Sequence, residues 1–228
     1  MYNPTPLLRA AFFGLLLLLP LGASANAKQK AEALVDNART TFVTVATHPD
    51  MTWLRANLHR AKGVMIFPQV LKGGFIVGGS GGSGVLVARD PKQGWSSPAF
   101  YTIGTASVGL QIGAQAAQVV MLVMTQKGID ALLTTKVNLG AGVSVAAGPV
   151  GVGAKAATAD LVQYSLTKGA FGGVSLDGAV IKVREDYNAA YYGKPVSPVD
   201  ILIKRTVRNP QATPLIRAIE KVEREASR

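Results

Sequence analysis

Glycine dominates the middle of this chain and limits what the chain can fold into. Of the 25 glycines, 22 lie between Gly63 and Gly178, and the residues between them include many Val, Ile, Leu, Phe and Tyr. Each glycine weakens a helix by about 1 kcal/mol relative to alanine, whereas strands tolerate glycine where backbones approach closely, bulge or bend. The segment therefore predicts a compact β-structure of short, closely packed strands.

Periodicity within this segment indicates where the strands lie. In residues 106–113, Val108, Leu110 and Ile112 share one face, and the other face carries small or polar residues. Residues 119–124 are continuously apolar, as expected of a strand that is buried on both faces. The other expected strands are 63–68, 74–77, 85–89, two strands that flank Gly148-Pro149 within 139–153, and 161–166, 171–176 and 179–184.

Helical patterns flank the β-rich segment on both sides. Residues 28–47 repeat apolar side chains at helical spacing, and a second helix is expected after His48-Pro49, up to about Arg60. Short helices fit residues 127–133 and 185–192, and the tail from Pro214 is amphipathic. The fold class is therefore α+β, with a glycine-rich, mainly antiparallel β core (barrel- or sandwich-like), N-terminal amphipathic helices and a C-terminal helix.

The first residues have the composition of an export signal. Arg9 is their only charge, residues 10–21 form an apolar run, and Ala23-Ser24-Ala25 is a small-x-small cleavage signal. A membrane anchor is the alternative, but a span needs about 20 apolar residues. We expect a signal peptide over 1–25, a helical segment over 26–62, a β-rich domain over 63–205 and a C-terminal helix over 206–228. The mature protein is then exported to the periplasm.

Charge and composition narrow the classes of partner. The net charge is +11, and the hydrophobic share of 48% is too high for a disordered chain. A balance this basic favours anionic partners, such as a phospholipid surface, nucleic acid or an acidic polymer. We do not expect nucleic acid, because its recognition motifs are absent and export removes it as the usual partner. Without cysteine, disulfides, thiolate metal sites and cysteine nucleophiles are excluded.

Motifs for catalysis match this sequence only in their letters. Residues 78–82 fit the G-x-S-x-G pattern around Ser80, but a strand is expected to follow instead of a helix, and His48 and His59 both precede it. Residues 79–84 and 151–156 resemble dinucleotide-binding glycine patterns without the full strand–turn–helix context. We therefore expect no enzyme, no cofactor and no metal site.

Several short segments, taken together, resemble the SYLF-domain family. The matching segments are Ala61-Lys-Gly-Val-Met-Ile-Phe-Pro68, Gly73-Gly-Phe75, Gly84-Val-Leu-Val-Ala-Arg89, Trp95-Ser-Ser-Pro-Ala-Phe100, Gly109-Leu-Gln-Ile-Gly-Ala-Gln115, Ala147-Gly-Pro149, Tyr164-Ser165, Lys168-Gly-Ala-Phe-Gly-Gly173 and Asn188-Ala-Ala-Tyr-Tyr-Gly193. Each is weak alone, but they occur in the family's order across about 61–205. The chain is similar to the exported bacterial branch, which lacks the SH3 or FYVE modules of eukaryotic relatives.

The resemblance implies binding of acidic phospholipids, helped by a basic amphipathic N-terminal segment; some fungal members also bind actin. Lys62, Arg89 and Lys168 fall on basic positions of the family's motifs, whereas Leu166 stands where an arginine is common. Phosphoinositides are not expected in a bacterial envelope. The implied ligand is therefore an anionic surface and not one particular lipid.

We expect an exported, non-enzymatic module that binds anionic phospholipid in the cell envelope. The expected contact residues are all basic: Lys28, Lys30, Arg39, Arg55, Arg60, Lys62, Arg89 and Lys168. At about 1 kcal/mol for each base near an anionic surface, four or five would give reversible association.

Alternatives stay open for the bases and for both terminal helices. The charges could serve only to keep an apolar protein soluble. The chain could also be a structural or protein-binding envelope component that uses the small-residue sheet face and the C-terminal helix. The first helix either only covers the end of the sheet or also lies on a membrane surface.

Overall fold

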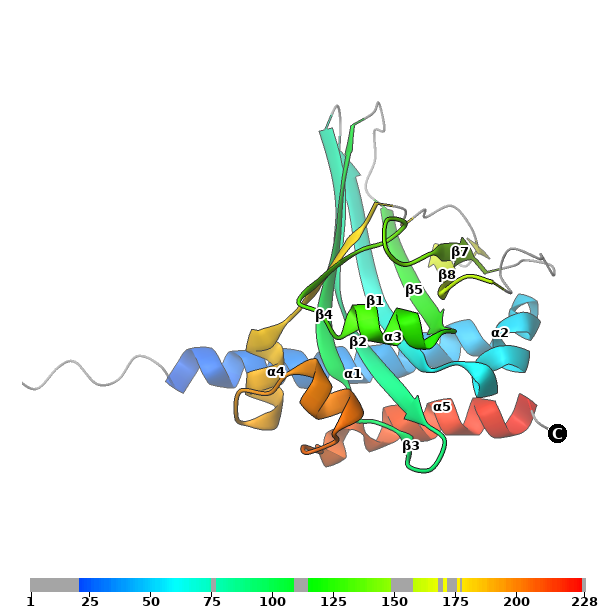
Figure 1. Cartoon of the computed structure of the whole chain (residues 1–228). Helices are drawn as coiled ribbons and strands as arrows, with labels where there is room; N and C mark the ends of the chain where they lie inside the picture. The colour runs from blue at the N-terminus through cyan, green and yellow to red at the C-terminus, as the bar shows by residue number, and fades with distance from the viewer. Residues whose placement is uncertain are drawn as a thin grey trace, which may run out of the picture.

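A single curled sheet lies at the centre of the computed structural model (Figure 1), which describes residues 21–74, 77–108, 115–148, 158–167, 170–171, 176 and 178–226. The strands in these ranges are β1 (Gly63–Gly74), β2 (Val77–Asp90), β3 (Gly94–Trp95), β4 (Ala99–Val108), β5 (Gln115–Val123), β6 (Lys136–Asn138), β7 (Val145–Ala147), β8 (Leu161–Thr167), β9 (Ala170–Phe171) and β10 (Val180–Val183).

The strand order is β6-β10-β4-β2-β1-β5-β8-β7, with β3 beside β2 and β9 beside β8. Neighbouring strands are antiparallel except β7 and β8, which are parallel. The sheet curls into a half-barrel (Figure 1). The expectation of an α+β fold with a mainly antiparallel core is confirmed, in the barrel-like form.

The central strands are longer than the glycine pattern suggested. β1 has 12 residues and β2 has 14, and β2 runs through the glycine-rich stretch instead of breaking there. A Cβ on Gly82 would lie less than 3.0 Å from the carbonyl oxygen of Gln69, next to the bulge in β1 between Ile66 and Gln69. Glycine here lets two strands approach closely at a bulge. The prediction of short strands was wrong for this part of the sheet.

The other sequence-predicted strands have mixed outcomes. Buried β5 and strands β8 and β10 agree with the patterns at 119–124, 161–166 and 179–184. Strand β4 begins at Ala99, earlier than the pattern at 106–113 indicated. Residues 109–114, 149–157 and 172–175 lie outside the described residues, and with them the remainder of those expected strands.

The described helices agree with the expected ones, apart from their ends. They are α1 (Leu21–Thr47), η1 (Pro49–Met51), α2 (Thr52–Asn57), η2 (Leu58–Arg60), α3 (Gln126–Leu132), α4 (Glu185–Tyr192), the π-helical turn η3 (Val199–Ile203), η4 (Pro210–Ala212) and α5 (Thr213–Ala226). α1 begins at Leu21, earlier than residue 28, which is the start expected from the sequence. α4 ends as expected at Gly193, whose φ of 72° suits a helix C-terminus.

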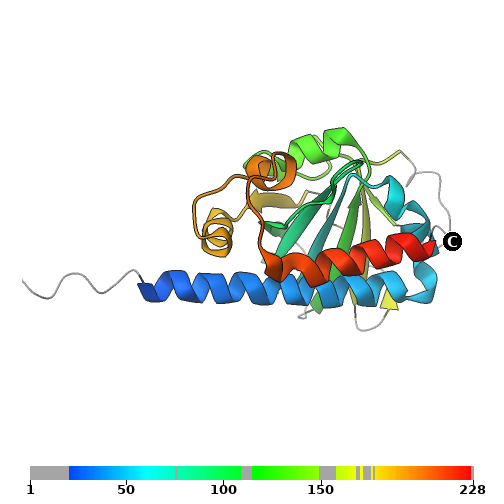
Figure 2. The ribbon, with the colours of Figure 1, turned by 90° about the horizontal axis from the view of Figure 1, so that it is seen from below.

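α1, α2, α4 and α5 cover one face of the sheet. α1 and α5 lie side by side and run in the same direction (Figure 2). Their buried side chains, among them Phe42 and Ile219, pack with Val85, Phe100 and Val120 of the sheet. This confirms that the N-terminal helices cover the sheet. It also places the apolar side of α5 (Leu215, Ile219, Val222) in the core.

The opposite face of the sheet packs against α3 and η3. Ile129 and Leu132 of α3 and Ile201 of η3 are buried with Tyr101 and Met121 of the sheet. The Tyr101 hydroxyl donates a hydrogen bond of 2.8 Å to the carbonyl oxygen of Leu132. Beyond these helices, the ends of β1, β2 and β4 extend away from both layers (Figure 1).

Candidate anion-binding site

The three expected contact residues on α1 share their helix with acidic side chains. Lys28, Lys30 and Arg39 are exposed, but Glu32 and Asp36 lie between them in the sequence. Glu32 approaches the Lys28 ammonium at 3.9 Å. The three bases therefore do not form an uninterrupted basic face, although all of them are accessible.

The Arg55 side chain forms hydrogen bonds with the backbone of the turn between α1 and α2. Its guanidinium donates to the carbonyl oxygens of Ala46 and His48, each at 2.8 Å, and to that of Pro49 at 3.3 Å. Carbonyls at a helix C-terminus lack intrahelical partners, and these bonds satisfy them. Arg55 thus stabilises the corner where proline ends α1.

Arg60, Lys62 and Arg89 are brought to the same end of the sheet. The Arg89 amide donates to the Lys62 carbonyl oxygen at 2.8 Å, so the two residues lie side by side where β1 begins and β2 ends. Arg60 and Lys62 are exposed, whereas the Arg89 guanidinium lies 2.7 Å from a carboxylate oxygen of Glu223 on α5. The indole of Trp95 donates to the other oxygen of Glu223 at 3.0 Å. Lys168 lies outside the described residues.

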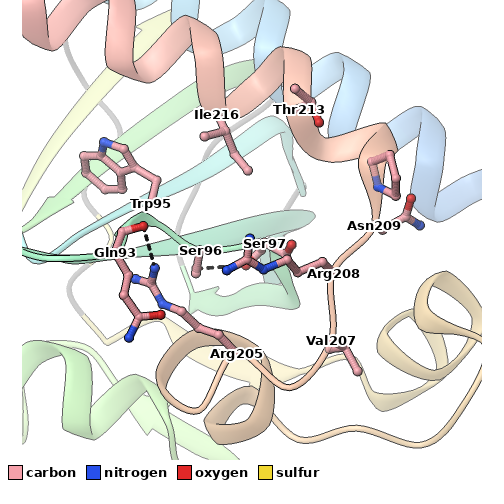
Figure 3. Close-up of a pocket in the computed structure, with 11 residues that line it drawn as sticks. Gln93, Trp95, Ser96, Ser97, Arg205, Val207, Arg208, Asn209, Thr213 and Ile216 are labelled. Carbon is pink, nitrogen blue, oxygen red and sulfur yellow. Dashed lines mark hydrogen bonds between the residues drawn. The ribbon is translucent and has the colours of Figure 1, made fainter.

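A pocket of about 290 Å³ lies beside Trp95, which forms part of its wall (Figure 3). It is formed by the turn between β2 and β3, the segment after η3 and the start of α5. The residues that line it are Gln93, Trp95, Ser96, Ser97, Arg205, Val207, Arg208, Asn209, Pro210, Thr213 and Ile216. None of them is acidic, and the first turn of α5 carries no acidic residue either.

Arg205 is held in the pocket wall by two backbone carbonyls. Its guanidinium donates to Gln93 O at 3.1 Å and to Gly94 O at 2.8 Å. Its φ of 54° is the only positive value among described residues other than glycine. A branched or long side chain rarely adopts this backbone conformation, and it persists where surrounding contacts hold it. These bonds fasten the segment after η3 to the β2–β3 turn.

Among the described residues, no carboxylate forms an ion pair with Arg205 or Arg208 of the pocket. Burial lowers the pKa of the Arg205 guanidinium; nearby Asp90 acts in the opposite direction, and the charge of Arg208 lowers the pKa further. The Asp90 carboxylate itself accepts hydrogen bonds from the amides of Lys92 and Gln93. Arg208 is exposed and has no hydrogen bond or ion pair with any described residue. Its side chain extends across the pocket toward Ser96 and Ser97 (Figure 3).

The sequence analysis missed Arg205 and Arg208. They belong to no motif, and more than 100 residues separate them from Gln93 and Trp95. Their nearest sequence signal is the cluster of bases from Lys204 to Arg208 before the C-terminal helix. A charge cluster of this kind usually indicates a solvated segment, so it does not reveal a pocket.

Among the described residues, no catalytic grouping forms around Ser80, whereas the glycine pattern at 151–156 lies outside the described residues. The Ser80 hydroxyl lies within strand β2, 2.7 Å from the Thr105 hydroxyl on the neighbouring strand β4. Over the described ranges, no three His, Asp or Glu side chains gather closely enough to hold a metal ion. None of the described helices has both the length and the hydropathy to cross a membrane.

Asp160 is the most heavily hydrogen-bonded carboxylate described, and its role is structural. It is 6% exposed and accepts from the hydroxyls of Thr125 (2.7 Å) and Ser144 (2.9 Å), from the Ser144 amide and from Lys127. Burial alone would raise the pKa of Asp160, but these bonds outweigh it and lower the pKa to about 2. The carboxylate connects the start of α3, the segment before β7 and the start of β8.

Replacing Asp160 with asparagine is expected to lower the free energy of unfolding by about 2 kcal/mol at pH 7, because buried donors lose a charged acceptor. A lowered pKa stabilises the fold above pH 3.8, and this contribution disappears as the pH falls through about 2. In thermal melts from pH 7 to 2, the difference in melting temperature between wild type and Asp160→Asn should become smaller as the pH falls. Asp130→Asn, at an exposed position on α3, is the control and should change little. A difference in melting temperature that does not change with pH would contradict the stabilising role of the Asp160 carboxylate.

Comparison with known proteins identifies the family. A sequence model of the Ysc84 family, described as "Las17-binding protein actin regulator", matches residues 104–222, which is more than half of the chain. The chain belongs to the Ysc84 family. The resemblance to the SYLF-domain family is thereby confirmed. In the Ysc84 match, the pocket wall from Arg205 to Ile216 is included, whereas Lys62, Arg89 and the N-terminal helices precede it.

Curated relatives extend the Ysc84 similarity over most of the chain. LAS seventeen-binding protein 3 of Saccharomyces cerevisiae is 36% identical over 171 residues, covering 72% of this chain and 37% of the yeast protein. The human SH3 domain-containing YSC84-like protein 1 is 31% identical over 220 residues, covering 92% of this chain and 63% of the human protein. The chain thus spans less than two thirds of either relative. The yeast protein's name refers to binding and the family description to binding and regulation, and neither these nor the human protein's name mentions a reaction.

Proposed function

We propose that this chain is an exported, non-enzymatic module that binds anionic phospholipid at a membrane surface of the cell envelope. The observation that carries the proposal is the pair of exposed bases Arg60 and Lys62 beside Arg89 at one end of the sheet. Neither Arg60 nor Lys62 has a carboxylate within 4.0 Å among the described residues. With the net charge of +11, such bases favour an anionic surface.

Export is compatible with the position of α1 in the fold. Cleavage after Ala25 would shorten α1 at its N-terminal end, which extends beyond the rest of the described fold (Figure 2). The described side chains before Ala31 are not buried, so the core would keep its α1 contacts. N-terminal sequencing of the protein recovered from the periplasm tests this directly, and we expect it to begin at Asn26.

The double variant Arg60→Glu/Lys62→Glu should bind anionic vesicles at least about tenfold more weakly, since each base near an anionic surface contributes about 1 kcal/mol. Binding is measured by sedimentation with phosphatidylglycerol or phosphatidylcholine vesicles at low and high salt. Wild type should bind only the anionic vesicles, and less at high salt. Arg89 is left unchanged, because its loss would also break the ion pair with Glu223.

The matched control reverses two other exposed lysines. Lys136 and Lys182 are paired across β6 and β10, and neither has a carboxylate partner among the described residues. Lys136→Glu/Lys182→Glu changes the net charge by the same amount as the test variant. If both doubles lose binding equally, net charge alone governs association and the Arg60–Lys62 surface is not the site. If the wild-type protein does not sediment with anionic vesicles, the proposal of lipid binding is wrong.

Protein binding is a second candidate, because the family description and the yeast relative's name refer to binding a protein. The apolar side of α5 is buried, so that helix offers a partner mainly its charged side. The sheet offers Leu71, which is 55% exposed and lies between Gly81 and Ala116 on the neighbouring strands. A partner captured by the wild-type chain in detergent and high salt, and lost with Leu71→Ser, would favour this function.

A further inference from the structure

The pocket beside Trp95 has the composition of an anion site that is distinct from the Arg60–Lys62 surface. Arg205 and Arg208 lie in its wall, none of its lining residues is acidic, and Arg205 is fixed by Gln93 O and Gly94 O. A guanidinium that is already held in place loses less freedom when it binds a ligand. Burial is the main cause of the lowered pKa of Arg205; Asp90 opposes it, and the nearby charge of Arg208 adds to it.

We propose that this pocket binds a phosphate group, with Arg208 and Arg205 as its principal ligands. Guanidinium groups present parallel N–H donors that match phosphate oxygens, which makes arginine the usual residue for such recognition. Arg208 has no described partner and can donate with its whole guanidinium, whereas Arg205 supplies charge from the pocket wall. The Thr213 hydroxyl, which also has no described partner, is placed to add a further donor.

The size of the pocket favours a small phosphate compound or a head group. Its volume of about 290 Å³ lies at the lower end of the range for small-molecule sites. Apolar wall is supplied by Trp95, Val207 and Ile216, so the group that carries the phosphate can pack there. A lipid head group and a soluble phosphate ester share this chemistry. The idea that the phosphate belongs to a lipid rests on the proposed function, whereas the phosphate site itself does not.

Trp95 provides a reporter for the test, since it lines the pocket and the other tryptophan, Trp53, lies in α2. In a Trp53→Phe background, inorganic phosphate should change the indole fluorescence saturably, and chloride at equal ionic strength should not. Arg208→Gln should weaken phosphate binding by about tenfold or more, since a charged hydrogen-bonding partner is lost. Arg217→Gln removes an exposed base on α5 outside the pocket and should bind as the parent does.

A second measurement separates the pocket from the membrane surface and from misfolding. Phosphate should raise the melting temperature of the parent but not that of Arg208→Gln. The melting temperature of this variant without phosphate should change little, because Arg208 is exposed and has no hydrogen bond or ion pair with a described residue. Vesicles of phosphatidic acid or phosphatidylserine in phosphatidylcholine then distinguish the sources. If Arg208→Gln binds phosphatidic acid vesicles more weakly than the parent does, but binds phosphatidylserine vesicles equally well, the ligand is a lipid phosphate monoester. Phosphate binding without any effect on vesicles supports a soluble ester.

Two results would overturn the phosphate site. One is the absence of any phosphate-specific change in Trp95 fluorescence and melting temperature. The other is an equal response in the parent and in Arg208→Gln. Loss of vesicle binding in Arg60→Glu/Lys62→Glu bears only on the proposed function, because those residues do not line the pocket.

Discussion

Replacing Gly82 with alanine is expected to lower the free energy of unfolding by about 3 kcal/mol or more, because the new methyl group has no space. A Cβ at this position would lie less than 3.0 Å from the carbonyl oxygen of Gln69 on β1. The obstacle is backbone at a β-bulge, so relief requires the two central strands to move apart. Urea unfolding followed by circular dichroism measures the change.

Gly81 supplies the matched control on the same strand. A Cβ there would meet the carbonyl oxygen of Ile103 at 3.5 Å, an ordinary van der Waals contact. Gly81→Ala should therefore be neutral or slightly stabilising, because alanine restricts the unfolded chain more than glycine does. Equal destabilisation by both variants would mean that strand glycines here act through general packing and not through the close approach at the bulge.

Replacing Phe42 with alanine should lower the free energy of unfolding by about 3–5 kcal/mol, as is typical of a large side chain removed from a packed core. Phe42 is fully buried among residues of α2, α5 and the sheet. This variant measures how much the inward side of α1 stabilises the fold in the absence of lipid. A small loss of stability would contradict the packing of Phe42 in the core.

Val43 is the adjacent residue on the same helix and is 39% exposed. Val43→Ala should change the free energy of unfolding by less than about 1 kcal/mol, because only partly buried atoms are removed. Comparable losses in the two variants would show that α1 does not depend on its inward face for stability. Thermal melts of both proteins in the absence of lipid provide the comparison.

Charge counts alone gave a poor guide to the candidate site. Lys62 and Arg89 were expected from motif positions, and the structure places them side by side. Arg55 was expected to contact lipid, yet its guanidinium is used at the end of α1. Sequence reasoning cannot separate these cases, because a base that binds nearby carbonyls and a base that faces solvent can look alike in a local pattern.

The sequence by itself determined the elements and their buried sides, because residues that share a face recur at 3.6 residues in a helix and at 2 in a strand. Thus Phe42 and Val45 of α1, and the buried run of β5, followed from local spacing. Only the tertiary structure decided the strand order, the continuity of β2 through its glycines, and the pocket of Trp95 and Arg208. Those features depend on contacts between segments far apart in the chain, which spacing within one segment does not encode.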